Sequence, residues 1–287
     1  MNTYFYIPYP QVVDKLKIFP GDILMVSADI SKLAFLTKKR GEEFDPNKLI
    51  DLLYEKIQPG GTLVIPTYTH LLESGDKFDL HKTRPLTGTL AIEALKREDY
   101  KRTAHPLHSF AVAGKYQEYL CNLTNKSSFG SDSPFAFFHN SNAKLLLIDL
   151  NLHYSLTYTH YVEESERVGY RYMKKMKFQY TDGVGNTDER EYFLYKKYPW
   201  ITMDFNPLEK IIGKSVIQDE KIAAIRYTII QLKEAYNIIK EDIINNKAKS
   251  ISKYSLMIFC KFLVKSVLKK INLYSSPSDK IRNANIL

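Results

Sequence analysis

The sequence predicts an α/β fold, in which helices flank a central, mostly parallel sheet in layers, followed by a β-rich hairpin insertion and a helical C-terminal tail. Short apolar segments of strand length alternate with amphipathic segments of helix length up to residue 166. Such alternation is typical of strands joined by crossover helices. Aromatic residues then alternate around an Asp-Gly turn, and the last part of the chain is basic and amphipathic.

The individual segments support this layout. We expect strands at 22–27, 62–66, 109–113 and 144–150, and helices at 10–17, 47–57, 90–96, 115–123 and 158–166. In the segment 47–57, apolar residues recur at helical spacing on one side. Ser133 and Pro134 precede the apolar run 135–138 as an N-cap and a first-turn proline, which indicates a further helix.

An antiparallel hairpin is expected after residue 168. Tyr170 and Tyr172 begin an alternating aromatic stretch, the turn follows at Asp182-Gly183, and a second stretch runs over 191–195. An Asp-Gly pair between two alternating stretches is a strong hairpin signal. These residues therefore interrupt the series of alternating strands and helices.

Length and composition are those of a globular protein. The chain has 287 residues, of which 44% are hydrophobic and 25% charged, which suits one large domain or two. Two cysteines are too few for a disulfide framework, and this indicates a reducing compartment. Neither a signal peptide nor an apolar run long enough to cross a membrane is visible, so we expect a cytoplasmic protein.

Several common enzyme classes leave a pattern that this sequence lacks. G-x-G-x-x-G, G-x-x-x-x-G-K-[ST], H-E-x-x-H and G-x-S-x-G are all missing. Dinucleotide-binding, P-loop, zincin and common hydrolase sites are therefore not expected. Histidines and cysteines do not cluster at zinc spacing, so no metal is expected either.

His160 and Glu163 are the clearest candidates for catalysis. They are three residues apart in the predicted helix 158–166, which puts both side chains on one face. A carboxylate beside an imidazole fixes its tautomer and stabilises the imidazolium that forms when the ring takes a proton. Histidine is also largely unprotonated near pH 7, as a general base must be. Taken alone, the pattern fits a buried structural histidine with a surface glutamate better than a catalytic pair.

Two further segments have polar groups that fit a site wall. His105 precedes Pro106, which favours extended backbone, and Ser109 follows at the start of a predicted strand. The same stretch also fits a turn in which His105 satisfies a backbone carbonyl. Phe129-Gly130 is typical of a loop, and the helix start at Ser133-Pro134 presents backbone N–H donors that can hold an anionic or carbonyl group.

Four segments occur in a fixed order between residues 102 and 163. They read Arg102-Thr-Ala-His-Pro-Leu-His-Ser109, Phe129-Gly-Ser-Asp-Ser-Pro134, Lys144-Leu-Leu-Leu-Ile148 and Thr157-Tyr-Thr-His-Tyr-Val-Glu163. Upstream lie Pro59-Gly-Gly-Thr-Leu-Val-Ile-Pro-Thr67, Phe78-Asp79 and Thr87-Gly-Thr89. Their order and spacing resemble the aminoglycoside 3-N-acetyltransferase (antibiotic N-acetyltransferase) family, over residues 10–215.

This resemblance implies an N-acyltransferase that uses acetyl-CoA or another acyl-CoA and acts on the amine of an amino sugar by direct attack in a ternary complex. His160 is then the general base, and Glu163 and Asp204 are the acids that accompany it. The positions implied for CoA are Ser27, Ser31, His105, Ser109, Phe129 and Gly130. Those implied for the acceptor are Asp79, Glu163 and Glu164, with the tyrosine-rich hairpin as a flap beside the acceptor.

One segment departs from the family pattern. Where the family has a His/Ser-rich turn and a glycine-rich loop, this chain has no glycine between Val26 and Gly41. Together with the tail, this departure favours an amino sugar of surface polysaccharide biosynthesis as the acceptor. An aminoglycoside antibiotic is the first alternative, and a non-catalytic scaffold for glycan assembly is the second.

Charge divides the chain into a catalytic domain, 1–244, and a basic C-terminal extension, 245–287. The extension has nine basic residues and one acid, a net charge of +8, whereas the domain has 32 basic and 31 acidic residues, a net charge of +1. Lys261, Lys265 and Lys269 recur beside a broad apolar side, as in helices that lie on the inner face of a membrane. Packing on the core or on a second subunit of a homo-oligomer fits equally well. No nucleic-acid-binding module is recognisable.

Overall fold

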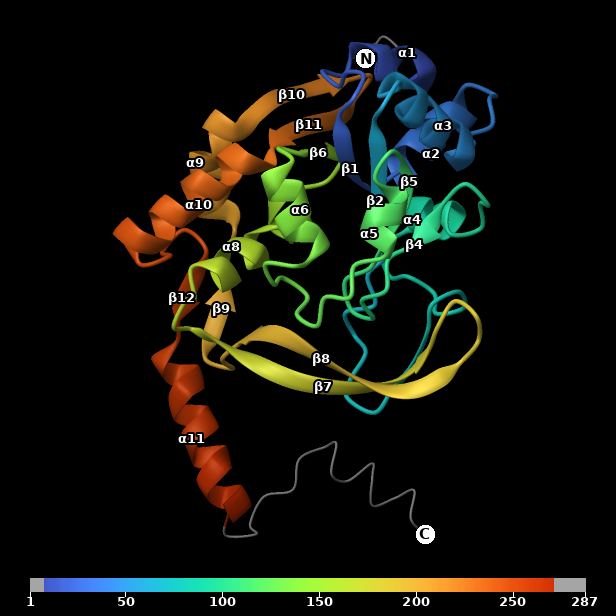
Figure 1. The fold of residues 1–287 in the computed structure, drawn as a ribbon. Helices are drawn as coiled ribbons and strands as arrows, with labels where there is room; N and C mark the ends of the chain where they lie inside the picture. The colour runs from blue at the N-terminus through green and yellow to red at the C-terminus, as the bar shows by residue number, and fades with distance from the viewer. Residues whose placement is uncertain (1–7, 271–287) are drawn as a thin grey trace.

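The structure, a computed structural model, describes residues 8–270 and is built around a seven-stranded sheet (Figure 1). The strand order is β10-β11-β6-β1-β2-β5-β4. The strands are β1 (Ile23–Ala28), β2 (Thr62–Pro66), β4 (Lys101–Arg102), β5 (Phe110–Gly114), β6 (Lys144–Ile148), β10 (Val216–Ile222) and β11 (Ile225–Gln231). The layered α/β architecture predicted from the sequence is confirmed.

The sheet is mixed in its pairing. β6, β1 and β2 pair in parallel, whereas β10–β11, β11–β6, β2–β5 and β4–β5 pair antiparallel. β10, β6, β1, β2 and β4 consequently run in one direction, and β11 and β5 in the other. Most strands therefore run in one direction, as expected for a mostly parallel sheet, but most neighbouring strands are antiparallel to each other. Short connections join β10 to β11 and β4 to β5, and they produce antiparallel pairs because a parallel pair needs a long crossover.

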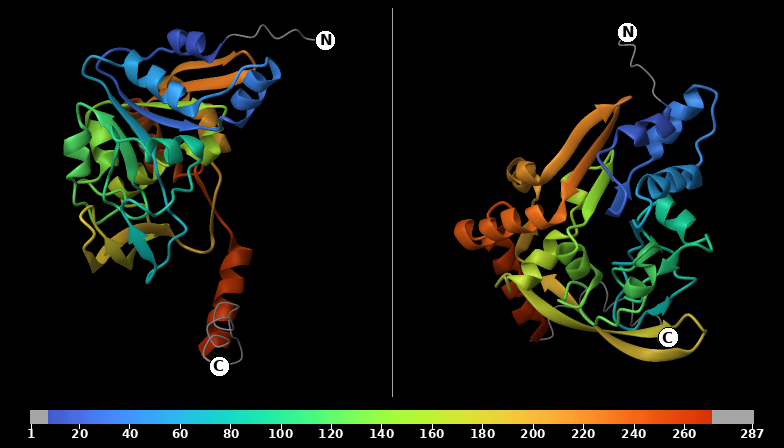
Figure 2. Two further views of the ribbon diagram at one scale, coloured as in Figure 1. Left: turned by 90° about the vertical axis from the view of Figure 1, so that its right-hand side faces the viewer. Right: turned by 45° about the horizontal axis from the view of Figure 1, so that its top comes forward.

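Helices cover both faces of this sheet (Figure 2). On one face lie α1 (Tyr9–Lys15), α2 (Ser31–Lys39), α3 (Pro46–Lys56) and α4 (Thr89–Ala94). On the other lie α5 (Gln117–Cys121), α6 (Pro134–Asn140), α8 (Thr159–Ser165) and α10 (Leu232–Asn246). Side chains alternate along each strand, so Leu24 and Leu146 pack in the first layer and Met25 and Leu147 in the second. The central strands are apolar on both faces for this reason.

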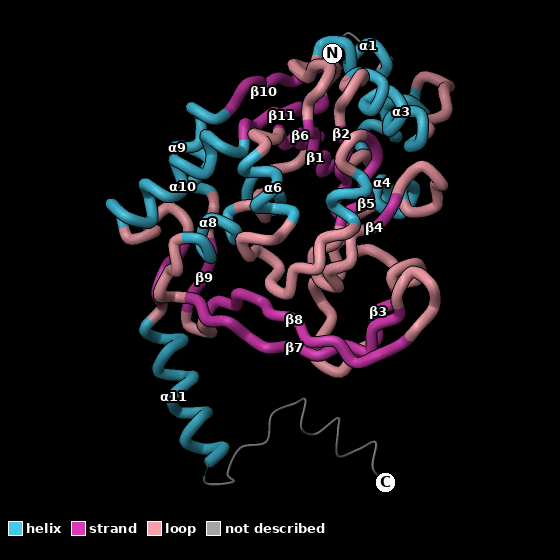
Figure 3. The backbone as a smooth tube through the Cα atoms, in the orientation of Figure 1, coloured by secondary structure: helices cyan, strands magenta, loops and turns pink. Residues whose placement is uncertain are grey.

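A second, smaller sheet lies below the first (Figure 3). It consists of β3 (Lys77–Asp79), β7 (Arg171–Thr181) and β8 (Thr187–Lys197). β7 and β8 form an antiparallel hairpin, and β3 pairs with β7 in parallel. The remaining short elements are α7 (Leu152–Ser155), β9 (Ile201–Met203), α9 (Asn206–Ile211), the 3-10 helix η1 (Ile212–Ser215) and β12 (Ser252–Tyr254), which pairs with β9.

The folded body extends beyond the boundary expected at residue 244. That boundary lies inside α10, and the chain after it remains packed, since Ala248 and Ile251 are buried and β12 pairs with β9. The part that projects from the body is α11 (Leu256–Lys270) (Figures 1 and 2). The rest of the predicted extension, 271–287, lies outside the described residues. Within residues 8–270, no helix is long and apolar enough to cross a membrane.

Candidate active site

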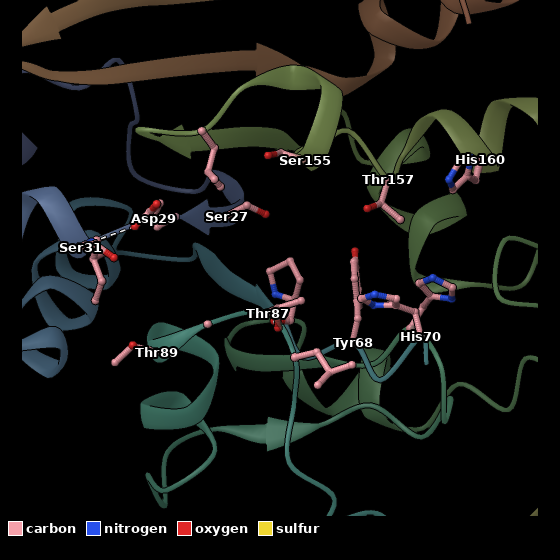
Figure 4. Close-up of a pocket in the computed structure, with 17 residues that line it drawn as sticks. Ser27, Asp29, Ser31, Tyr68, His70, Thr87, Thr89, Ser155, Thr157 and His160 are labelled. Atoms are coloured by element: carbon pink, nitrogen blue, oxygen red, sulfur yellow. Dashed lines mark hydrogen bonds between the residues drawn. The ribbon is translucent and has the colours of Figure 1, made fainter. Parts of the chain in front are cut away.

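A cavity of about 610 Å³ opens at the carboxyl ends of the three parallel strands. Ser27 and Ala28 end β1, Pro66 ends β2, and Leu150 follows β6; all four line it (Figure 4). This edge is where open α/β sheets usually bind ligands, because the connections diverge there and leave a crevice.

The cavity has two chemically different sides (Figure 4). The hydroxyl groups of Ser27, Ser31 and Thr89 lie on one side, and the other side has aromatic and imidazole rings together with the Thr157 hydroxyl. The hydroxyl residues are Ser27, Ser31, Thr87, Thr89, Ser155 and Thr157, and the ring residues are Tyr68, His70, His108 and His160. Ser27 and Ser31, which the sequence assigned to CoA, therefore both line the cavity. Ser31 is the first residue of α2, a helix that replaces the loop expected there, and its N–H donates to Asp29 Oδ1 at 2.9 Å.

His160 and Glu163 contact each other on α8, as their spacing predicted. His160 Nδ1 lies 2.7 Å from Glu163 Oε2. A hydrogen must lie between these atoms, because two lone pairs at that distance would repel, so Nδ1–H donates to the carboxylate. The Arg171 Nη2 atom lies 2.9 Å from the same Nδ1 and acts there as a neighbouring positive charge. This arrangement leaves the lone pair of the ring on Nε2.

Glu163 is held as a buried carboxylate by several partners. Its side chain is fully buried, Arg171 Nε lies 2.8 Å from Oε2, and the Tyr170 hydroxyl donates to Oε1 at 2.8 Å. Burial alone would raise the pKa of Glu163, but the bond from His160, the charge of Arg171 and the Tyr170 hydroxyl together lower it. The carboxylate therefore stays ionised at neutral pH.

His160 is kept neutral by its surroundings. Burial lowers its pKa, the charge of Arg171 lowers it further, and the bond and charge of Glu163 oppose both effects; the net direction is down. Its side chain is still 25% exposed and lines the cavity. An unprotonated imidazole that opens to a cavity is what a general base requires.

His105 and Ser109, which the family resemblance implies for CoA, are buried and do not line the cavity. Ser109 Oγ accepts from Arg102 Nε at 2.9 Å and donates to the Thr67 carbonyl at 2.9 Å. His105 Nδ1 accepts from the N–H groups of Leu107 and His108 at 3.2 and 3.4 Å. Burial lowers the pKa of His105 to about 3. Both side chains thus organise the turn before β5, close to the structural alternative considered for His105.

His108 is one of the cavity residues that the sequence analysis did not assign to the site. It lies in the same segment, but its ring lines the cavity and packs edge-on against Tyr68 at 5.0 Å. Because adjacent side chains of an extended chain point to opposite faces, His108 faces the cavity while Ser109 faces the interior. This alternation beside a predicted strand was the available signal. The buried Phe129 ring packs against both imidazoles, with its centroid 4.7 Å from that of His108 and 5.4 Å from that of His160.

Other predicted residues are engaged elsewhere in the fold. Asp79 Oδ1 accepts from two backbone N–H groups of a turn, and Glu164 accepts from Ser127 at 2.7 and 2.9 Å. Gly130 lies in the same loop, where a Cβ atom would meet an Asp132 oxygen at 2.9 Å. Asp204 pairs with Lys253 at 2.8 Å, while the carboxylate on His160 is that of Glu163. In the described chain, none of these four residues lines the cavity.

The sequence and fold were compared with known proteins. The family model for aminoglycoside 3-N-acetyltransferase matches residues 25–243. Aminoglycoside N(3)-acetyltransferase IV of Salmonella sp is 29% identical over 159 residues, which are 54% of this chain. The match spans 57% of the length of that curated relative.

Solved structures of similar fold agree with the family match. AAC-IIIb in a binary complex with CoASH has a TM-score of 0.70 at 16% identity, over 86% of this chain and 96% of that one. YokD of Bacillus subtilis has a TM-score of 0.67 at 17% identity, over 84% and 94%. The AAC(3)-IVa apoenzyme has a TM-score of 0.64 at 20% identity, over 86% and 92%. At these sequence identities, the solved structures show only that the fold is shared. The family model matches most of this chain, residues 25–243, and the chain therefore belongs to the aminoglycoside 3-N-acetyltransferase family.

Proposed function

We propose that the protein is an acyl-CoA-dependent N-acyltransferase that acylates an amine of an aminoglycoside, with His160 as the general base. The observation that carries the proposal is the neutral His160, held by the buried, ionised Glu163 at the edge of a cavity. An ammonium has no lone pair, so an amine must lose a proton before or as it attacks a thioester.

The contacts of His160 define its part in the reaction. The ammonium first loses one proton to solvent, and Nε2 then takes a second proton from the neutral amine as its nitrogen bonds to the thioester carbonyl carbon. Glu163 stabilises the resulting imidazolium and keeps Nδ1–H oriented. The C–S bond then breaks, and the proton passes from the imidazolium to the departing CoA thiolate. Arg171 keeps Glu163 ionised in both states of the ring.

The hydroxyl side of the cavity fits a CoA co-substrate. Ser27, Ser31, Thr87 and Thr89 supply hydroxyl groups along one wall, which suits the amide and carbonyl groups of a pantetheine arm. Ser31 also begins α2, whose N-terminal end faces the cavity. The related AAC-IIIb structure was obtained with CoASH.

An aminoglycoside is the acceptor that we favour. The relatives include an AAC(3)-IVa variant in complex with a gentamicin and AAC-VIa bound to sisomicin. The preference drawn from the sequence for an amino sugar of surface polysaccharide has no support from these relatives.

An acetylation assay tests the proposal. The protein is incubated with acetyl-CoA and either gentamicin, sisomicin or an amino-sugar nucleotide, and released thiol is followed. We expect thiol release that depends on the aminoglycoside and a product heavier by one acetyl group. Release with the amino-sugar nucleotide alone would overturn the acceptor. Failure to bind CoA in calorimetry would overturn the enzyme and favour a non-catalytic scaffold.

We further propose that α11 lies on the surface of an anionic membrane. Leu256, Met257, Leu263, Val264 and Val267 are each between 46% and 65% exposed on this helix. Lys261 and Lys265 are exposed on another side, and Phe259 and Phe262 hold the helix to the Trp200 ring at 5.0 and 5.2 Å. Exposed apolar residues beside lysines, with six basic residues and one acid over 256–287, a net charge of +5, complement anionic lipid rather than a neutral protein surface.

A further inference from the structure

A chain of three buried side chains leads from the interior to the cavity. His105 Nε2 lies 3.4 Å from Ser128 Oγ, and Ser128 Oγ lies 3.0 Å from His108 Nδ1. The exposed fractions are 1% for His105, 1% for Ser128 and 8% for His108. Of these three side chains, the His108 ring lines the cavity. None of the three hydrogen-bonds to the His160–Glu163 pair in the described chain, so the reaction as derived above leaves them without a part.

Backbone N–H groups determine where the hydrogen atoms lie in this row of three side chains, His105, Ser128 and His108. Two backbone N–H groups, those of Leu107 and His108, point at His105 Nδ1 and can only donate. Nδ1 therefore has no hydrogen, and the neutral His105 ring carries its proton on Nε2. His105 also hydrogen-bonds the Lys126 backbone, and Ser128 Oγ cannot donate to its protonated Nε2. His108 Nδ1, at 3.0 Å, is then the acceptor for the Ser128 hydroxyl hydrogen. His108 then carries its own proton on Nε2.

The surroundings preserve this arrangement. Phe193 on β8 holds the loop of Ser128 with two backbone bonds: Ser128 N–H donates to Phe193 O at 3.2 Å, and Phe193 N–H donates to Lys126 O at 2.8 Å. Burial lowers the pKa of His108 well below its ordinary value, because a charged imidazolium would lose its hydration there. The His108 ring is therefore neutral at physiological pH and has one defined donor.

We propose that His108 donates its Nε2–H to the thioester carbonyl oxygen as negative charge develops there, with Ser128 and His105 as the positioning residues that set its tautomer. The two imidazoles of the cavity have opposite roles: Glu163 accepts from His160 Nδ1 and leaves a lone pair on Nε2, whereas Ser128 donates to His108 Nδ1 and leaves an N–H. The rings flank the same Phe129. A fixed neutral donor of this kind stabilises an oxyanion without reorganisation.

The electron and proton movements balance with these groups. When the amine nitrogen bonds to the carbonyl carbon, the C=O electron pair moves to oxygen and is stabilised by His108 Nε2–H. His160 takes one proton from the amine. The pair then returns to re-form C=O, the C–S bond breaks, and the CoA thiolate takes the proton from His160. His108 keeps its own proton throughout. The inference rests on the proposed acyl transfer.

The tautomer is measured directly by NMR on the full-length protein labelled with ¹⁵N-histidine. We expect His108 with a protonated Nε2 and an unprotonated Nδ1, a pattern assigned with His108→Gln. S-acetonyl-CoA, a ketone analogue of acetyl-CoA, should then move the His108 Nε2–H resonance downfield. A proton on Nδ1, or binding of the analogue without that shift, would overturn the role of His108. Lack of any binding would instead overturn the proposed function, and this inference with it.

Kinetics separate a donor from a merely structural side chain. His108→Ala should lower kcat by about 10²- to 10³-fold, the usual effect of losing one oxyanion donor, with the KM for acetyl-CoA changed less than about threefold. The acidic limb of the pH profile, which reports His160, should not move. Ser128→Ala should lower kcat in the same way, and Ser128→Thr, which keeps the hydroxyl, should restore it. A shift of the limb, or equal losses with Thr and Ala at 128, would contradict the proposal.

Discussion

The Glu163 carboxylate contacts two basic side chains, His160 and Arg171. It accepts from His160 Nδ1 and pairs with Arg171, and all three side chains are largely buried. Burial and the charge of Arg171 lower the pKa of His160, while Glu163 raises it. The balance leaves His160 neutral yet able to take a proton. The protonation state of His160 therefore depends on opposing charges, and each member of the group can be tested by the sign of its effect on that state.

Removing the base is the first test at this scale. His160→Ala should lower kcat by about two to four orders of magnitude, because a positioned base typically contributes that much. The affinity for CoA, measured by calorimetry, should stay nearly constant, since the hydroxyl wall that we assign to CoA is on the other side of the cavity. A loss of less than tenfold in kcat would show that another group takes the proton.

The two neighbours of His160 should shift its pH profile in opposite directions. Glu163→Gln removes the group that raises the His160 pKa, so the acidic limb of kcat/KM moves to lower pH. Arg171→Gln removes a charge that lowers this pKa, so the limb moves to higher pH. Both variants should lower kcat by about tenfold or more. Glu163→Gln removes the carboxylate that orients the His160 ring, and Arg171→Gln removes a partner of that carboxylate. Shifts of the same sign would contradict the assignment.

Single residues were only partly predictable from the sequence. The spacing of His160 and Glu163 was enough, because a short helix brings positions three apart together whatever surrounds it. The burial of His105 and Ser109 away from the cavity was not predictable, because a motif does not say which of its side chains face a cavity. Arg171 has no local signal, since it reaches Glu163 from the start of β7.

At the scale of elements, helices and strands with regular apolar spacing were predictable, and turns with unusual chemistry were not. The β10–β11 hairpin turns at Ala223 and Ala224, which have φ of 49° and 73°. Such left-handed turn positions normally have Asn or Gly, so the sequence contains no hairpin signal there. The β10–β11 hairpin and the short β4–β5 connection both add antiparallel pairs to the sheet, and the sequence did not predict the hairpin. Tertiary packing against β6, through Ile229 and Ile230, holds the turn in place.

One close approach between elements gives a stability prediction. Gly114 ends β5 with φ of 106°, and a Cβ there would lie 2.3 Å from the Gly61 carbonyl oxygen beside β2. Gly114→Ala should therefore lower the free energy of unfolding by about 3 kcal/mol or more, combining backbone strain with a backbone clash. Gly213→Ala is the matched control: its Cβ meets open space and its φ is not left-handed, so it should change stability by less than about 0.5 kcal/mol. Urea unfolding followed by circular dichroism compares the two, and equal midpoints would contradict the clash.

The whole molecule separates a mildly basic body, with 35 basic and 31 acidic residues over 1–255, from an extension with six basic residues and one acid over 256–287. The body holds the cavity and the seven-, three- and two-stranded sheets, and α11 projects from it beyond the packed segment that ends at β12 (Figure 1). The division was visible in the sequence as a change in charge, but its position was not, because Ala248 and Ile251 complete the core from within the basic region. A deletion that tests the extension must therefore begin after residue 255, so that β12 is kept.

The last prediction concerns binding of α11 to lipid. The intact protein should sediment with vesicles of phosphatidylcholine and phosphatidylglycerol, and not with phosphatidylcholine alone, and added salt should weaken the binding. Lys261→Gln with Lys265→Gln should reduce the partition coefficient by about 30-fold, since each lysine contributes about 1 kcal/mol near an anionic surface. Lys38→Gln with Lys39→Gln removes the same charge from exposed positions on α2 and should have little effect.

The apolar side of α11 distinguishes lipid from a protein partner. Leu263→Gln with Val267→Gln should abolish vesicle binding and leave the melting temperature and acyl transfer unchanged, because both side chains are exposed in the folded protein. Deleting 256–287 should act in the same way on vesicles and spare activity on a soluble acceptor. If the intact protein ignores anionic vesicles, and the deletion instead lowers the melting temperature or changes the oligomeric state in light scattering, then α11 packs on protein and the membrane proposal is wrong.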